Sequence, residues 1–311
     1  MFPKITNHAE VMAILHAPAQ WSNKVSAHLQ VPNGMDPPEH GIYRALIEPF
    51  FTAQALAPYE PVLQQMAHDI LTDLPDDFDP LHDLGFPYAL RAQCAFMGWP
   101  EAMEQQLLSW MVAQRAATER SELRELAQQF QALIVAQLAQ TSASADDDSV
   151  TARLMSLQVD GQPLSTDFLV SIIRNWTVGE LATLAHAAAS VVQYLQQHEE
   201  INTVLRAEPA RIDAAMDEIL RIYAPLAANR RRAVCPAQLS SGTIAAGTVV
   251  SLDWAAANRD LAVFADPLQF RWHRNPQHNL LYGAGIHVCP GAPLARMELR
   301  ALVLALLHRT T

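Results

Sequence analysis

Cys289 ends a glycine-rich run and precedes a helical segment, a combination that suits a reactive or metal-binding thiol. Residues 282–291 are Tyr-Gly-Ala-Gly-Ile-His-Val-Cys-Pro-Gly, and the helical segment 292–308 follows at once. The positive end of a helix dipole favours thiolate over thiol, and the thiolate is the form that binds metals. The alternative is a structural cysteine in a glycine-rich turn, because a short motif also matches by chance.

Charged residues recur at helical spacing elsewhere in the chain. Glu218 and Arg221 stand three residues apart on a helical stretch, so their side chains share a face. His40 and Arg44 stand four apart, just after an Asp-Pro-Pro sequence typical of a helix start. Taken alone, each pair is ordinary: the first would be a solvated surface pair and the second a helix N-terminus.

Together these segments resemble the cytochrome P450 superfamily of haem-thiolate monooxygenases. The cysteine loop of that family follows the pattern Phe-x-x-Gly-x-x-x-Cys-x-Gly; here Gly285, Cys289 and Gly291 match it, and Tyr282 replaces Phe. The resemblance implies that Cys289 is the axial ligand of the iron of haem b, donating electron density that favours O–O cleavage. Pro290 departs from the family, because it lacks the backbone N–H that the residue after the ligand usually donates towards sulfur.

The resemblance also assigns roles to residues outside this loop. It implies that two carboxylates of the haem, its propionates, are bound through charge-assisted hydrogen bonds. The expected cofactor contacts are His40, Arg44, Gly179, Arg231, Tyr282, His287 and Cys289. Arg231 is chosen from three consecutive arginines by counting back from residues 239–244. Glu218, Arg221 and Arg274 are expected to form a structural cluster behind the cysteine loop, with no catalytic role.

A long apolar segment, residues 165–197, corresponds to the oxygen-activating helix of the family. Gly179 and Thr183 match the family motif Ala/Gly-Gly-x-Asp/Glu-Thr, whereas Glu180 replaces its second glycine and Ala182 its acid. Glu180 and Thr183 are the expected catalytic residues, with Glu180 one helical turn before Thr183. In the alternative interpretation Thr183 is a core residue and Glu180 turns away to pair with a cation such as Arg174 or His186.

Composition and patterning predict one mainly α domain over residues 1–311, with small β-sheets and the family pattern shortened at both termini. Helices are expected at 59–74, 103–110, 122–138, 165–197 and 292–308, and a β-hairpin from 238–239 and 243–250, with Gly242 and Gly247 marking turns. Residues 141–148 are expected to form a mobile loop. The formal net charge of −11 argues against a nucleic-acid surface. Three cysteines without Cys-x-x-Cys spacing indicate neither a disulfide framework nor a zinc site.

The function that follows from the resemblance is haem-thiolate monooxygenation of a small apolar organic substrate. Electrons are expected from a separate ferredoxin or reductase. A cytoplasmic location is expected, with no membrane and no nucleic-acid partner, because no basic-then-apolar signal and no apolar run of about 18 residues is present. Two alternatives stay open: a peroxide-driven haem-thiolate peroxygenase, and a non-catalytic haem sensor or carrier of the same fold.

Overall fold

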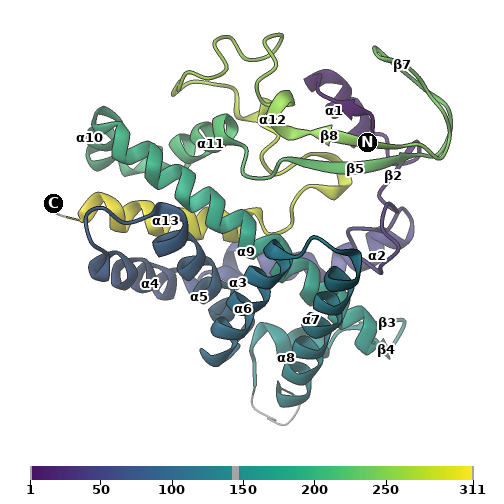
Figure 1. Cartoon of the computed structure of the whole chain (residues 1–311), viewed down its shortest axis with the longest axis horizontal. Helices are drawn as coiled ribbons and strands as arrows, with labels where there is room; N and C mark the ends of the chain where they lie inside the picture. The colour runs from purple at the N-terminus through teal and green to yellow at the C-terminus, as the bar shows by residue number, and fades with distance from the viewer. Residues whose placement is uncertain (1, 142–146, 310–311) are drawn as a thin grey trace.

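The computed structural model describes residues 2–141 and 147–309, and its architecture is mainly helical (Figure 1). The predicted loop at 141–148 falls largely outside the described residues. The α-helices are α1 (His8–Leu15), α2 (Glu39–Ile47), α3 (Ala53–Leu56), α4 (Tyr59–Asp73), α5 (Phe86–Met97), α6 (Ala102–Ala116), α7 (Arg120–Thr141), α8 (Val150–Met155), α9 (Thr166–Gln197), α10 (Glu199–Ala207), α11 (Ile212–Tyr223), α12 (Trp254–Ala257) and α13 (Ala292–His308).

Short helical turns of other types connect several of these helices. They are η1 (Glu48–Phe51), η2 (Pro80–Gly85, a π-helical turn), η3 (Pro209–Arg211), η4 (Pro276–His278) and η5 (Gly285–His287). Among them η5 lies inside the glycine-rich run before Cys289, so this part of the loop is a single tight turn.

The strands form one four-stranded sheet and two hairpins. They are β1 (Lys4–Ile5), β2 (Trp21–Ser22), β3 (Gln158–Val159), β4 (Gln162–Pro163), β5 (Ala228–Ala233), β6 (Ala237–Leu239), β7 (Gly242–Ile244) and β8 (Val249–Asp253). The large sheet has the order β1-β8-β5-β2, with β1 parallel to β8 and the other pairs antiparallel.

The predicted turn at Gly247 is confirmed, and only the residues before it belong to the predicted hairpin. β7 pairs with β6 in a hairpin, whereas β8 pairs with β5 and β1 in the large sheet. Between them the backbone turns at Gly247, whose φ of 81° is the left-handed conformation that glycine adopts readily. The apolar residues on either side of this turn therefore belong to different sheets.

The central helix α9 is 32 residues long and organises the helical part of the molecule. Ser165 caps its first turn by accepting a hydrogen bond from the backbone N–H of Phe168, as serine at an N-cap commonly does. Helices α5, α7, α11 and α13 all pack against it. The predicted helix at 165–197 is confirmed, as is the predicted helix at 292–308.

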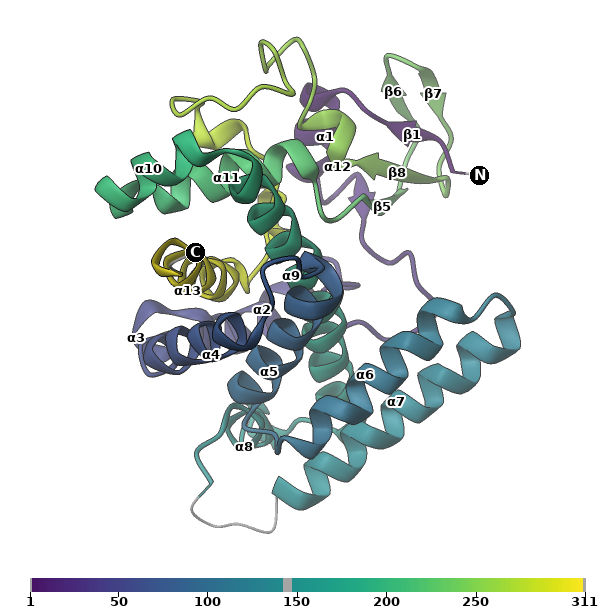
Figure 2. The same ribbon diagram turned by 60° about the vertical axis from the view of Figure 1, so that its left-hand side comes forward.

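Helix α13, which follows the cysteine loop, lies between the α10–α11 pair and α4 in both ribbon views (Figure 2). Helices α6 and α7 form a long antiparallel pair, which lies on the side of α5 away from α4 (Figure 2). The large sheet packs with α1 and α12 in a second, smaller apolar cluster that includes Trp21, Leu252 and Trp254. Among the described residues, no helix combines the length and apolar character needed to cross a membrane.

Candidate functional site

The cysteine loop is closed by hydrogen bonds between its own backbone groups. The N–H of Cys289 donates to the carbonyl of Tyr282 at 2.9 Å, and the N–H of Val288 donates to the carbonyl of Gly285 at 3.1 Å. Gly283 and Gly285 have φ values of 71° and 70°, which only glycine adopts without strain. These turns hold Cys289 three residues before Ala292, the first residue of α13.

The thiol of Cys289 is solvent-accessible, yet it lies in dense surroundings that disfavour its ionised form. Burial raises its pKa, and the negative charge of Glu180 adds to that effect. The backbone N–H groups of Gly291 and Ala292 donate to the sulfur and act in the opposite direction, together with Arg44. For the free thiol, desolvation therefore outweighs the effect of the helix start. A bound metal would replace the thiol proton.

Basic side chains gather beside the loop, and of these only Arg44 is paired with an acid among the described residues, Glu48 at 2.8 Å. The rings of His40 and His287 lie 4.3 Å apart, and the Nε2 atom of each is buried without a hydrogen-bond partner among the described residues. Arg44 donates to the carbonyl of Val288 at 2.7 Å, which ties α2 to the cysteine loop. Buried Arg231 donates only to the carbonyl of its neighbour Arg230 within the described residues.

The pKa values show how poorly this basic cluster is compensated. Burial lowers the pKa of His287 to about 3, and the nearby charges of His40 and Arg231 lower it further. Burial likewise lowers the pKa of Arg231 to about 10, with Asp36 as the opposing charge. Buried donors in this state require an anionic partner that can accept several hydrogen bonds at once. The cluster therefore fits the two carboxylates of a haem, and Cys289 fits its iron.

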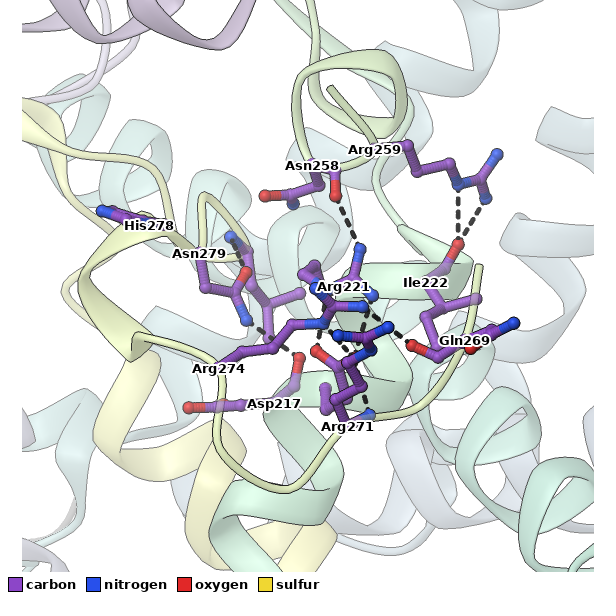
Figure 3. A network of polar contacts seen from close by, with 12 residues as sticks. Asp217, Arg221, Ile222, Asn258, Arg259, Gln269, Arg271, Arg274, His278 and Asn279 are labelled. Carbon is purple, nitrogen blue, oxygen red and sulfur yellow. Dashed lines mark hydrogen bonds and ion pairs between the residues drawn. The ribbon is translucent and has the colours of Figure 1, made fainter. Parts of the chain in front are cut away.

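Glu218, Arg221 and Arg274 lie together, as the sequence led us to expect. Arg221 donates to both carboxylate oxygens of Glu218, at 2.7 and 2.9 Å, and Arg274 donates to one of them at 2.7 Å. Figure 3 shows the two arginines meeting with Arg271, whose backbone N–H donates to Glu218 at 3.2 Å.

The remaining donors of these arginines are bound to backbone carbonyls of the segment before the cysteine loop. Arg221 donates to Asn258 and Arg274 donates to Gln269 (Figure 3). Arg274 also donates to Ala265 and Asp266. The ring of Phe264 covers both guanidinium groups. The cluster thus holds α11 to the irregular segment that leads into the loop.

The centre of α9 presents an exposed face and a half-buried acid. Val178, Gly179 and Ala182 are exposed although α9 crosses the middle of the molecule, and a Cβ added to Gly179 would meet nothing within 4 Å. Thr183 is half-buried on the same stretch. Glu180 instead turns its side chain towards Glu298 of α13, and its Oε1 atom is buried.

Neither cation considered for Glu180 is its partner. Arg174 donates to the backbone carbonyl of Leu29, and the His186 ring packs edge-on against Phe86. The acid that Glu180 does meet, Glu298, was missed by the sequence analysis. Its signal is a lone glutamate four residues after Leu294 and four before Leu302, which places it on the buried stripe of an apolar helix.

Comparison with known proteins gives the same result as the geometry. A family model described as Cytochrome P450 matches residues 186–310. Mycinamicin IV hydroxylase/epoxidase of Micromonospora griseorubida is 31% identical over 284 residues, covering 88% of this chain and 71% of the relative. Cyclomarin C epoxidase of Salinispora arenicola is 28% identical over 292 residues, covering 88% of this chain and 72% of that protein.

A solved structure of similar fold is that of a mutant of P450 EryK in complex with erythromycin B. It has a TM-score of 0.89 and 25% identity, covering 98% of this chain and 82% of that one. The chain belongs to the cytochrome P450 family. In class it is a P450-type monooxygenase, an oxidoreductase, and the family implies a haem with a cysteine thiolate ligand. The predicted family and fold class are confirmed.

Proposed function

We propose that this protein is a haem-thiolate monooxygenase that binds haem b through Cys289 and inserts one oxygen atom into a small apolar organic molecule. The observation that supports it most is the position of Cys289 beside His40, His287 and Arg231, three buried or half-buried basic side chains without a carboxylate hydrogen-bond partner among the described residues. In this proposal His40, Arg44, Arg231 and His287 bind the two propionates. When bound, the haem iron supplies dioxygen activation, for which two electrons come from a separate ferredoxin or reductase.

The protein's own groups then have distinct tasks around the cofactor. Gly291 and Ala292 donate backbone hydrogen bonds to the sulfur and hold it in place. Gly179 leaves the α9 face free of side-chain atoms, and Tyr282 is fixed by the Arg296 guanidinium 4.5 Å from its ring centre. Thr183 and Glu180 hold protons on the α9 side, as a hydroxyl and a carboxyl group one helical turn apart.

A peroxide-driven peroxygenase is the second candidate, and one observation favours it. The acid expected beside Thr183 is replaced by exposed Ala182, while the nearby acid, Glu180, points towards α13. Peroxide already brings both oxygen atoms, their electrons and protons, so such an enzyme depends less on a proton supplied at position 182. For both candidate activities, the proposed location of the protein is the cytoplasm.

The ligand assignment is tested by the carbon-monoxide spectrum of the ferrous, haem-loaded protein. Thiolate ligation gives a strongly red-shifted Soret band, and Cys289→His is expected to abolish that shift while some haem stays bound. Cys235→Ser is the matched control, since Cys235 is an exposed free cysteine in a different part of the chain. A wild-type protein with only the histidine-type band would overturn the assignment.

The oxidant and the role of the α9 acid are separated by a pair of variants. Glu180→Ala and Thr183→Ala are assayed with peroxide alone and with a surrogate reductase system. Loss of peroxide-driven turnover in Glu180→Ala, with haem content unchanged, supports acid–base catalysis by Glu180. Full activity of both variants in both assays would show that these side chains are structural, and absence of any turnover in haem-loaded wild type would favour a sensor.

A further inference from the structure

Two carboxyl groups, one half-buried and one fully buried, meet between the central helix and the helix that follows the cysteine loop. Glu180 lies on α9 and Glu298 on α13, two helices that pack against each other. Glu298 is completely buried, at 0% exposure. Three of the four carboxylate oxygens, Oε1 of Glu180 and both of Glu298, are buried without a hydrogen-bond donor among the described residues.

No cation in the described part of the chain neutralises these two acids. The arginines of α13 are directed to α11, because Arg296 bonds Asp217 at 2.9 Å and Arg300 bonds Asp213 at 3.2 Å. On α9, Arg174 donates to the backbone carbonyl of Leu29 and His186 packs against the ring of Phe86, so neither contacts the two acids. Each acid therefore has only the other as its close polar partner.

The other titratable groups around the pair are weak acids, which cannot supply positive charge. The Tyr88 hydroxyl of α5 donates at 2.7 Å to the backbone carbonyl of Glu298, not to its carboxyl group. Burial raises the pKa of Tyr88, and the negative charges of Glu298 and Glu180 raise it further. Tyr282 and Cys289 also feel the charge of Glu180, each with a pKa raised chiefly by burial.

We propose that Glu180 and Glu298 form a carboxylic acid–carboxylate pair that holds a single proton between α9 and α13 at neutral pH. Two adjacent buried carboxylates repel each other and lack solvation, whereas one shared proton replaces that repulsion with a charge-assisted O–H···O bond. The bond forms without any further group, and a proton that moves from one acid to the other leaves the pair with a charge of −1.

The direction of the pKa changes fits this arrangement. Burial raises the pKa of Glu298 well above its usual value, and the charge of Glu180 raises it further. Burial also raises the pKa of Glu180, but the bond from Glu298 opposes that rise. Glu298 is therefore the main proton carrier, and Glu180 is the acceptor.

For the chemistry, which rests on the proposed function, the pair stores a proton one helical turn before Thr183. Glu298 is a positioning residue in this scheme, because it acts through Glu180. It keeps the Glu180 side chain turned to α13 and sets the pH at which that side chain gains a proton.

The pair is tested by the pH dependence of unfolding of the haem-loaded protein in urea. In the unfolded chain both acids have a pKa of about 4.3, so above about pH 5 unfolding releases the shared proton. The pKa in the folded state is raised, so this contribution to stability is complete below the unfolded pKa and is lost as the pH rises. The unfolding equilibrium constant should gain about tenfold per pH unit from this source.

The double variant Glu180→Gln/Glu298→Gln retains side chains of nearly the same shape and has no proton to release. On unfolding it releases one proton fewer than wild type does. Its unfolding constant is therefore expected to rise with pH about tenfold less per pH unit than that of wild type. Contributions of the histidines whose pKa is lowered by burial, including His186, cancel in this comparison. Glu60→Gln, at an exposed position of α4, should follow the wild-type curve. Equal slopes in wild type and the double variant would overturn the proposal.

Infrared spectra of the folded proteins give a second readout that does not depend on unfolding. At pH 7, the difference between wild type and Glu180→Gln/Glu298→Gln should contain the carbonyl band of one protonated carboxylic acid, shifted in deuterated water. Absence of that band would also overturn the pair. The proposed haem-thiolate ligation is tested separately, by the carbon-monoxide spectrum of the same wild-type preparation. That spectrum depends on the axial ligand and not on the carboxyl pair, so failure of one proposal is distinguished from failure of the other.

Discussion

Gly285 of the cysteine loop lies directly against the backbone carbonyl of Leu15, the last residue of α1. A Cβ atom added at Gly285 would come closer than 3.0 Å to that carbonyl oxygen, a distance that real Cβ contacts essentially never show. The N-terminal helix and the loop that holds Cys289 are therefore in backbone contact, although 270 residues separate them in the sequence.

Gly285→Ala is expected to destabilise the protein far more than Gly283→Ala. Both positions have positive φ, which costs roughly 1–2 kcal/mol for alanine. Gly283 has open space around it, with only a Trp254 ring atom at 3.9 Å, so it isolates the cost of the backbone conformation. Displacement of α1 by the added methyl group brings the total for Gly285→Ala to about 2–5 kcal/mol.

The measurement is urea unfolding of the haem-loaded proteins, together with their haem content. Haem content should fall in Gly285→Ala, because the loop that carries Cys289 has to move. Equal losses of stability in the two variants would show that the backbone at Leu15 moves away from the added methyl group at little cost in free energy.

Glu218→Ala should be among the most destabilising single changes in the chain. It leaves Arg221, only 1% exposed, as a buried charge without its carboxylate. Breaking a buried pair in this way costs about 3–5 kcal/mol. Glu208→Ala is the control, because Glu208 and Arg211 form an exposed pair at the same spacing and 2.7 Å distance.

Loss of the exposed Glu208 pair should cost no more than ~0.5 kcal/mol. Urea unfolding of both variants compares the two directly. If Glu218→Ala proved as mild as Glu208→Ala, the cluster would not be what holds α11 to the segment before the loop.

Local motifs predicted the parts of the site that are local in sequence. The turn before Cys289 and the helix after it depend on neighbouring residues, so their types were enough to predict them. The meeting of Glu180 with Glu298 depends on how α9 crosses α13, which no spacing within either helix reveals. The turn at Gly247 was predicted from its residue type, but the strands on its two sides pair in different sheets, which local propensity does not reveal.

Cys94 should resist alkylation in the folded protein, in contrast to Cys235. Cys94 is 2% exposed on α5, and burial raises its pKa to about 12, with a smaller contribution from Glu104. Since the thiolate is the reactive form, its population at pH 8 is roughly a thousandfold below that of an ordinary cysteine with a pKa of about 8.5. Cys235 is exposed and should react readily.

Peptide mass spectrometry after iodoacetamide treatment of the haem-loaded protein measures both sites, and denaturant should make Cys94 react as well. The raised pKa also gives a sign for stability: the contribution of the protonated Cys94 is complete below pH 9 and is lost between about pH 9 and 12. Labelling of Cys94 at the rate of Cys235 in the native state would contradict its burial.

Pro290→Leu should raise the reduction potential of the bound haem. The sulfur of Cys289 already accepts backbone hydrogen bonds from Gly291 and Ala292, whereas Pro290 has no N–H to offer. An additional donor would withdraw charge from the thiolate, weaken its donation to iron and stabilise the reduced state. Spectroelectrochemical titration of the substrate-free protein measures this potential.

Pro293→Leu is the matched control, since Pro293 is an exposed proline in the first turn of α13, two residues beyond Gly291. It tests whether loss of a rigid ring at the helix start changes the potential by loosening the loop. The hydrogen-bond explanation requires a rise in Pro290→Leu and little change in Pro293→Leu. An unchanged or lower potential in Pro290→Leu would mean that the two existing donors already determine the charge on the sulfur.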